Sequence, residues 1–140
     1  MSWIYESANA RYLLNELWRG EFGGRKVEVL GTEDAYSHEP DSDLFTEDTG
    51  VYRVLLSHEP LKQLVTEKAD LMLFGHTHGG QINVLGVTCY LLMKYERRFR
   101  FYCLAGTKKV GNSTLLVSRG VGYSKLPIRL GAASEIHYIK

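Results

Sequence analysis

The chain has 140 residues, of which 44% are hydrophobic and 24% are charged, and these are ordinary values for a globular domain. The length suits one domain with a real core and excludes a second full domain. A formal net charge of +1 excludes a disordered charged tail and a nucleic-acid binder that works by bulk charge, so no nucleic-acid partner is expected. The sequence shows neither a signal peptide nor an apolar stretch of roughly 18 residues, and a cytoplasmic or membrane-associated protein is expected.

Charge is distributed unevenly along the chain. Residues 1–50 carry 4 basic and 11 acidic side chains, a net charge of −7, whereas residues 51–140 carry 13 basic and 5 acidic ones, a net charge of +8. Two interpretations are open: two solvated faces of opposite charge, or a basic half that faces an anionic substrate.

The first third of the chain predicts a helix, a strand and a long loop. Residues 7–19 place apolar side chains near one helical face, with Ser7 as a candidate N-cap and Gly20 just beyond the end. Residues 26–30 alternate in hydrophobicity and predict a strand. Residues 31–50 are polar and acidic, and a loop of this length is uncommon in a compact domain unless it is functional or disordered.

The next segment predicts a βαβ unit over about residues 51–74. Residues 51–57 predict a strand, and Pro60 suits the first turn of a helix. Residues 71–74 form a continuous apolar run, which is typical of a strand buried on both faces. Two such strands separated by a helix are parallel and lie in one sheet.

The remainder of the chain predicts mostly strands. They are expected at residues 84–93, 99–105, 113–118 and 135–140, with a turn at 108–112 and a glycine-containing loop at 119–130. The order of elements indicates an α/β fold that becomes mostly β toward the C-terminus.

A basic cluster falls between two of these expected strands, and it consists of Lys94, Arg97, Arg98 and Arg100. The cluster suits contact with phosphate or with a membrane surface, and it equally suits a charged edge that prevents strand pairing. The two cysteines, Cys89 and Cys103, are too few for a disulfide framework and are expected to be buried thiols.

The strongest motif is Gly75-His76-Thr77-His78-Gly79-Gly80, which directly follows the apolar run at residues 71–74. Imidazole is the commonest metal ligand in proteins, and the flanking glycines let a ligand approach the backbone closely. Two polar loop histidines beside a turn are the alternative interpretation.

His58 also directly follows a strand, the one expected at residues 51–57. Parallel neighbouring strands end at the same edge of a sheet, and this brings His58 to His76 and His78. Three histidines at one edge predict a metal site.

Two runs closely resemble motifs of the calcineurin-like metallophosphoesterases: Leu55-Leu56-Ser57-His58-Glu59-Pro60, and residues 69–81, which end in Gly-His-Thr-His-Gly-Gly-Gln. Residues 117–122 and 126–129 look like the bacterial branch typified by membrane-associated phosphoesterases. The resemblance spans about residues 51–140.

The resemblance implies a hydrolase of phosphomonoesters or phosphodiesters with two divalent ions, Mn, Fe or Zn. His58 and His76 would hold one ion and His78 its neighbour. Gly79, Gly80 and Arg119 would contact the substrate. The implied fold is the C-terminal part of a layered αββα sandwich.

The chain also departs from the family, because the Asp-x-His, Gly-Asp-x-x-Asp and Gly-Asn-His motifs are absent. Three carboxylates in the acidic loop, Asp34, Asp41 and Asp43, lack the family spacing and are interpreted as solvated. We therefore expect one incomplete domain over residues 1–140, with a divergent acidic segment at 1–50 and catalytic residues that stay unassigned.

Two functions remain open from the sequence: a phosphoesterase that carries part of its site, inactive as an isolated chain, and an inactive metal-binding or interaction module. A missing N-terminal half, or a second copy of the chain, is expected to cover the exposed sheet.

Overall fold

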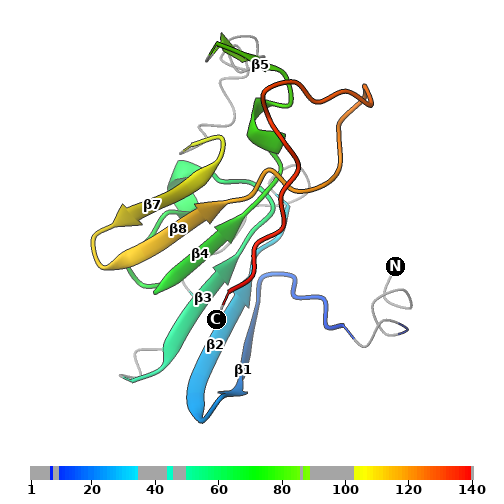
Figure 1. Cartoon of the computed structure of the whole chain (residues 1–140). Coiled ribbons are helices and arrows are strands. Elements are labelled where there is room, and N and C mark those ends of the chain that lie inside the picture. Colours follow the sequence, from blue (N-terminus) through cyan, green and yellow to red (C-terminus); the bar gives the residue numbers. More distant parts are fainter. Residues whose placement is uncertain are drawn as a thin grey trace.

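A computed structural model of the chain describes residues 7, 10–34, 44–45, 50–85, 87–88 and 103–139, with residues 87–88 described by their backbone alone. A six-stranded sheet dominates it, in the order β1-β2-β3-β4-β8-β7 (Figure 1). The strands of this sheet are β1 (Glu16–Phe22), β2 (Arg25–Gly31), β3 (Tyr52–Leu56), β4 (Leu71–Phe74), β7 (Gly106–Val110) and β8 (Ser113–Val117). A separate short hairpin pairs β5 (Asn83–Val84) with β6 (Val87–Thr88).

The four central strands of the sheet, β2, β3, β4 and β8, are parallel. The parallel strands expected within residues 51–74 are therefore confirmed. The helix expected from Pro60 is wrong, because the connection carries only the 3-10 turn η1 (Lys62–Leu64). Leu61 and Leu64 still reach the core from this turn, and extended backbone at Val65 then leads the chain toward β4.

The helix expected at residues 7–19 is also wrong, because Glu16–Phe22 is an edge strand paired antiparallel with β2. Gly23 and Gly24 join the two strands with φ of 58° and 77°, backbone angles that favour glycine and suit a two-residue hairpin. Pairing along the whole of β2 satisfies the backbone of this segment and overrides its weak helical pattern.

The core lies on one face of the sheet. Leu30, Leu55, Met72 and Leu115 occupy one row across the parallel strands, and each is 0% exposed. Because successive side chains in a strand point to opposite faces, the next residues along face the other side. On that side Leu56 is 37% exposed, and the C-terminal tail passes across the sheet (Figure 1).

The C-terminal strands differ from expectation in their bounds. β7 begins at Gly106, so residues 108–110 belong to a strand and the turn lies at residues 111–112. The strand at 113–118 is confirmed, with β8 ending at Val117. Residues 135–139 form no strand, because Glu135 bonds instead to the loop after β8, where its backbone N–H donates to the Gly120 carbonyl at 3.1 Å.

Several expectations fall on residues outside the described ranges: most of the strands at 84–93 and 99–105, the basic cluster and Cys89. Cys103 is a free, partly buried thiol that precedes β7. Within the described residues the sheet is mixed and helical structure is sparse, which agrees with part of an α/β domain. No helix in those ranges has the length and hydropathy to cross a membrane.

Candidate metal centre

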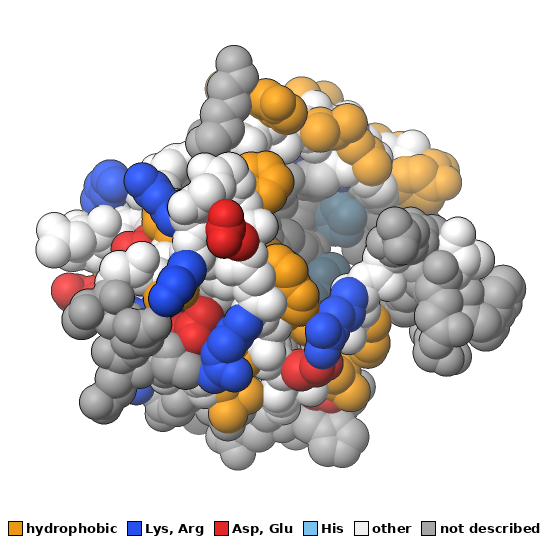
Figure 2. Space-filling view, turned by 90° about the horizontal axis from the view of Figure 1, so that it is seen from below, with side chains coloured by type: hydrophobic (Ala, Val, Ile, Leu, Met, Phe, Trp, Pro, Cys, Tyr) orange, Lys and Arg blue, Asp and Glu red, His pale blue; other side chains and the backbone are white. Residues whose placement is uncertain are grey.

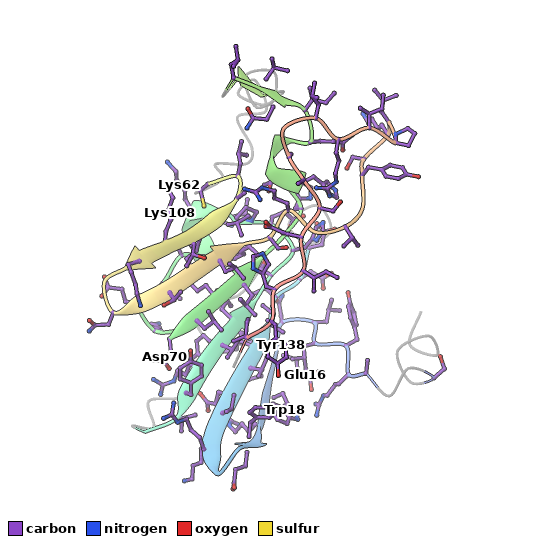
Figure 3. The ribbon with its side chains drawn as sticks, in the orientation of Figure 1. Glu16, Trp18, Lys62, Asp70, Lys108 and Tyr138 are labelled. Carbon is purple, nitrogen blue, oxygen red and sulfur yellow. The ribbon has the colours of Figure 1, made fainter. Side chains whose placement is uncertain are left out.

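The candidate site lies at the carboxyl edge of the parallel strands, where β3 and β4 end. The ladder continues just beyond both strands: the Ser57 N–H donates to the Leu73 carbonyl at 3.1 Å, and the Gly75 N–H donates to the His58 carbonyl at 3.0 Å. These bonds place His58 beside the glycine-rich loop. Asp70 marks the opposite end of β4 (Figure 3), where its carboxylate accepts from the Arg53 N–H at 2.7 Å.

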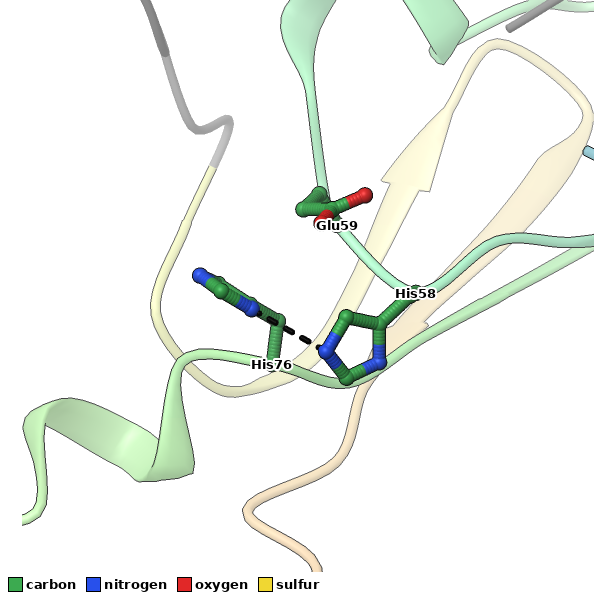
Figure 4. Close-up of side chains that lie close together, drawn as sticks. All are labelled: His58, Glu59 and His76. Carbon is green, nitrogen blue, oxygen red and sulfur yellow. Dashed lines mark hydrogen bonds between the residues drawn. The ribbon is translucent and has the colours of Figure 1, made fainter. Parts of the chain in front are cut away.

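His58 and His76 face each other across this edge (Figure 4). His58 Nε2 and His76 Nδ1 are 3.1 Å apart, and the two rings meet edge to face with centroids 4.9 Å apart. Two nitrogens bound to one tetrahedral zinc ion lie roughly 3.3 Å apart, given bonds of about 2.05 Å. The pair is therefore spaced as two ligands of a single ion would be.

Glu59 is the acidic neighbour of this pair, and sequence reasoning missed it. Its side chain is 1% exposed, and one ligand atom from each of His58, Glu59 and His76 lies within 4.8 Å of the others. Burial of a carboxylate beside two imidazoles suits a divalent cation, because the cation balances the buried negative charge. The sequence did hold a signal, since Glu59 directly follows His58.

The loop after β4 has a strained backbone, and it includes the 3-10 turn η2 (His78–Gly80). His76, His78 and Gln81 have φ of 64°, 50° and 54°, in the left-handed region that L-residues rarely adopt. Each such residue costs on the order of 1–2 kcal/mol, and strain of this kind concentrates at functional sites.

Gln81 offsets part of that cost by holding the loop that follows β8. Its side-chain amide donates to the Leu126 carbonyl at 2.9 Å, and its side-chain oxygen accepts from the Ser124 N–H at 2.7 Å. The glycine-rich loop and the loop of residues 119–130 thus form one hydrogen-bonded unit.

His78 points toward this second loop, and its Nδ1 lies 3.0 Å from Arg129 Nη2. Burial is the largest cause that lowers the pKa of His78, and the positive charge of Arg129 is the second. A hydrogen bond to the Arg119 backbone raises this pKa and offsets part of the decrease. A ring with a lowered pKa is neutral at neutral pH, which is the state that metal binding requires. The charge of His58 also lowers the pKa of His78, so the two rings share one electrostatic environment.

The three residues expected to contact the substrate, Gly79, Gly80 and Arg119, differ in their surroundings. Gly79 and Gly80 are buried, and Gly79 lies under the aliphatic part of Arg119. Arg119 Nη1 donates to Glu135 Oε2 at 2.7 Å, so its guanidinium is engaged in an ion pair. The pKa of Glu135 lies below its ordinary value. The largest cause is the hydrogen bond from the Arg119 backbone N–H, and the hydrogen bond with His137 lowers the pKa further.

A cavity of about 900 Å³ opens beside His58, over the face of the sheet opposite the core. Its lining includes Asp34, Ser118 and His137. Figure 2 shows histidine side chains within a hollow of the molecular surface. Asp34, expected to be solvated, thus lines the same cavity as His58, while Asp41 and Asp43 lie outside the described residues.

Known proteins resemble this chain over much of its length. The metallophosphoesterase YkuE of Bacillus subtilis is 32% identical over 117 residues, covering 81% of this chain and 40% of its own. The phosphodiesterase YaeI of Escherichia coli is 31% identical over 133 residues, covering 94% and 47%. A bovine transmembrane protein with a metallophosphoesterase domain is 40% identical over 88 residues, covering 59% and 18%.

No protein-family model matches the chain, and no solved structure matches it. The chain spans about half or less of the length of these curated relatives. The histidine motifs, their shared edge and the relatives agree, and the chain belongs to the calcineurin-like metallophosphoesterase family.

Proposed function

We propose that this chain carries part of the metal site of a phosphoesterase that hydrolyses a phosphomonoester or a phosphodiester. The observation that carries the proposal is the pairing of His58 and His76, whose facing nitrogens lie 3.1 Å apart where two parallel strands end. The relatives named metallophosphoesterase and phosphodiesterase support the same class of reaction.

In this proposal His58 and His76, with Glu59 beside them, hold one divalent ion, and His78 belongs to a second. Imidazole and carboxylate ligands suit Mn, Fe or Zn without selecting sharply among them. When bound, such ions would supply Lewis-acid chemistry, polarising the phosphoryl group and activating water. The residues of this chain would bind and orient the ion at an edge of the sheet where Glu59 is buried and His58 is exposed.

The glycine-rich loop is proposed to receive the phosphate ester. Gly79 and Gly80 are buried, and Gly79 lies under the Arg119 side chain, so a phosphate would reach their backbone only when Arg119 moves away. Arg119 reaches the substrate only if its ion pair with Glu135 opens, so we propose it as a secondary contact.

We further propose that more polypeptide completes the site, as an N-terminal half or a second copy of the chain. The reason is chemical: three imidazoles and one carboxylate are few ligands for two ions, and a single neutral ligand holds a hard divalent ion poorly against water. Contact with a membrane surface remains a prediction, because the basic cluster lies outside the described residues.

Calorimetric titration of the metal-free chain with Mn²⁺ or Zn²⁺ tests the metal assignment. His76→Ala should weaken binding at least tenfold, because it removes one of two facing ligands, whereas His137→Ala removes a histidine outside the pair and should leave binding unchanged. Equal affinity in wild type and His76→Ala would contradict the assignment.

Activity separates the two functions that the sequence left open. With Mn²⁺, the isolated chain should hydrolyse bis-p-nitrophenyl phosphate negligibly, and an added N-terminal half should restore turnover. Metal binding that never leads to turnover, even with that half present, would favour an inactive metal-binding module.

A further inference from the structure

Glu135 carries a carboxylate that is surrounded by hydrogen-bond donors, where the C-terminal tail of residues 135–139 meets the loop after β8. Its Oε1 accepts from the Arg119 backbone N–H at 2.8 Å, and its Oε2 accepts from Arg119 Nη1 at 2.7 Å. His137 Nε2 lies 3.0 Å from Oε1, and the ring donates here because an ionised carboxylate only accepts. These three donors form an anion site, and Glu135 of the same chain occupies it.

This anion site opens to the cavity beside His58. Glu135 and His137 line that cavity, together with the two residues that flank Arg119 in the chain. The side chains of Arg119, Glu135 and His137 are each between 21% and 38% exposed, so water reaches all three. A dissolved anion can therefore approach the donors from the same cavity that leads to the candidate metal centre.

The donors match the shape and the charge of a phosphodiester group. A carboxylate presents two oxygens that share one negative charge, and the two non-bridging oxygens of a phosphodiester do the same. Both anions accept charge-assisted hydrogen bonds, for which the planar guanidinium of Arg119 is well suited. A phosphomonoester dianion brings a third oxygen and additional charge that Glu135 does not have, so it resembles the present occupant less.

The side chain of Glu135 can leave the site without release of the whole tail. The tail stays attached through the Glu135 backbone N–H, which donates to the Gly120 carbonyl at 3.1 Å. The tail packs loosely around this point, because Ile136 and Tyr138 are 86% and 84% exposed. Rotation of the Glu135 side chain would pass its carboxylate to water, while both donors of Arg119 stay in place.

We propose that Glu135 is an internal competitor at an anion site formed by Arg119 and His137, and that a phosphodiester group takes its place there. The apparent affinity for the diester is then the intrinsic affinity multiplied by the fraction of molecules in which the carboxylate has moved away. The link to a substrate rests on the proposed function, whereas the anion site itself needs no metal ion.

Titration of the metal-free protein with diethyl phosphate, followed by proton–nitrogen NMR at neutral pH and low salt, measures this competition. The backbone N–H of Arg119 and the ring of His137 report occupancy of the site. Glu135→Gln keeps the shape of the side chain but removes its charge, so the diester should bind about fivefold more tightly than to wild type. Glu67→Gln is the matched control, since it removes one negative charge from an exposed position outside the cavity and should leave the affinity unchanged.

A second variant tests the donors. Arg119→Met in the Glu135→Gln background removes the guanidinium and should abolish binding of the diester. The proposal would be overturned if Glu135→Gln bound diethyl phosphate no better than wild type, or if the double variant bound it equally well. Tighter binding of inorganic phosphate than of diethyl phosphate to Glu135→Gln would also overturn it, because a diester would then not be the preferred ligand.

These measurements involve no metal ion, so they separate the anion site from the proposed reaction. A confirmed site in a protein that never turns over, even with an added N-terminal half and Mn²⁺, would contradict the proposed function and leave the competition by Glu135 established.

Discussion

Gly79 shows how a single residue supports the site. Its φ is +63°, and an added Cβ would lie 2.9 Å from Cγ and Cδ of Arg119, a side chain that Glu135 holds in place. The glycine thus meets two requirements, a left-handed backbone and a close approach of the neighbouring loop.

Gly79→Ala should therefore destabilise the protein by about 2–3 kcal/mol, through left-handed strain and overpacking together. Gly120→Ala is the matched control, since Gly120 has φ of +62° but nothing within 4 Å of an added Cβ. It should cost only the strain, about 1 kcal/mol. Urea unfolding of the two variants measures the difference, and equal losses would show that Arg119 moves aside freely.

Glu135 makes stability depend on pH. The Arg119 backbone N–H is the largest cause that lowers its pKa from an ordinary value of 4.5, and His137 contributes further. A carboxylate whose folded pKa is lowered stabilises the fold above its ordinary pKa, and that contribution disappears as pH falls through the folded value.

Glu135→Gln should thus destabilise the chain at pH 7 by less than about 1 kcal/mol, because the ion pair is partly exposed. The gap between wild type and variant should close as the pH falls below 4.5. Urea unfolding at a series of pH values measures the gap, and a constant gap from neutral to acid would contradict the ion-pair account.

For individual residues, the sequence predicted the histidines of the site but not Glu59 beside them. His58 and His76 could be predicted to meet, because parallel strands end at a common edge. Glu59 was not identified, since whether a carboxylate beside a histidine turns inward depends on packing around it, here the burial of Pro60 and Leu61. Arg129 and His78 are 51 residues apart in the sequence, so no local sequence pattern could predict their contact.

Among the elements, buried strands were predicted best. The run at residues 71–74 is apolar on both faces. Such a run is typical of a central strand in a parallel sheet, because that strand is covered on both sides. Glu16–Phe22 was mistaken for part of a helix because Leu13 and Leu17 are four positions apart, a helical spacing. The glycine pair at 23–24 supplied a hairpin turn, and long-range pairing with β2 then prevailed over the local pattern.

The short connection between β3 and β4 contributes two buried leucines to the core, Leu61 and Leu64. Leu64 in η1 is 1% exposed and packs into the core with Leu55 and Met72. Leu64→Ala should cost about 2–4 kcal/mol, since it removes buried methyl groups and leaves a cavity. Lys62→Ala, in the same turn but exposed, should change the unfolding free energy by less than about 0.5 kcal/mol.

Thermal and urea unfolding measure both variants of η1. Similar small losses in the two would mean that η1 does not close the core. A large loss for Lys62→Ala would instead indicate that the turn itself, rather than Leu64, matters for stability.

For the molecule as a whole, the decisive feature is the difference between the two faces of the sheet. One face is closed by the core, while the other carries Leu56, Leu73 and Leu116 on the wall of the cavity beside His58. Apolar side chains on an accessible sheet face favour association, because burying them releases free energy in proportion to the area covered.

Leu56→Lys tests whether this face binds further polypeptide. The chain is expected to associate with itself at high concentration through the open face, or with an added N-terminal half. A charge at Leu56, which is 37% exposed, should weaken either association at least tenfold while sparing the fold, because a lysine can extend its ammonium to water.

Phe22→Lys is the control. Phe22 is 81% exposed on the edge strand β1, so this variant should leave association unchanged. Sedimentation velocity over a range of concentrations measures the effect. Association that is equally strong in wild type and Leu56→Lys, or that Phe22→Lys alone abolishes, would move the contact from the open face to the sheet edge.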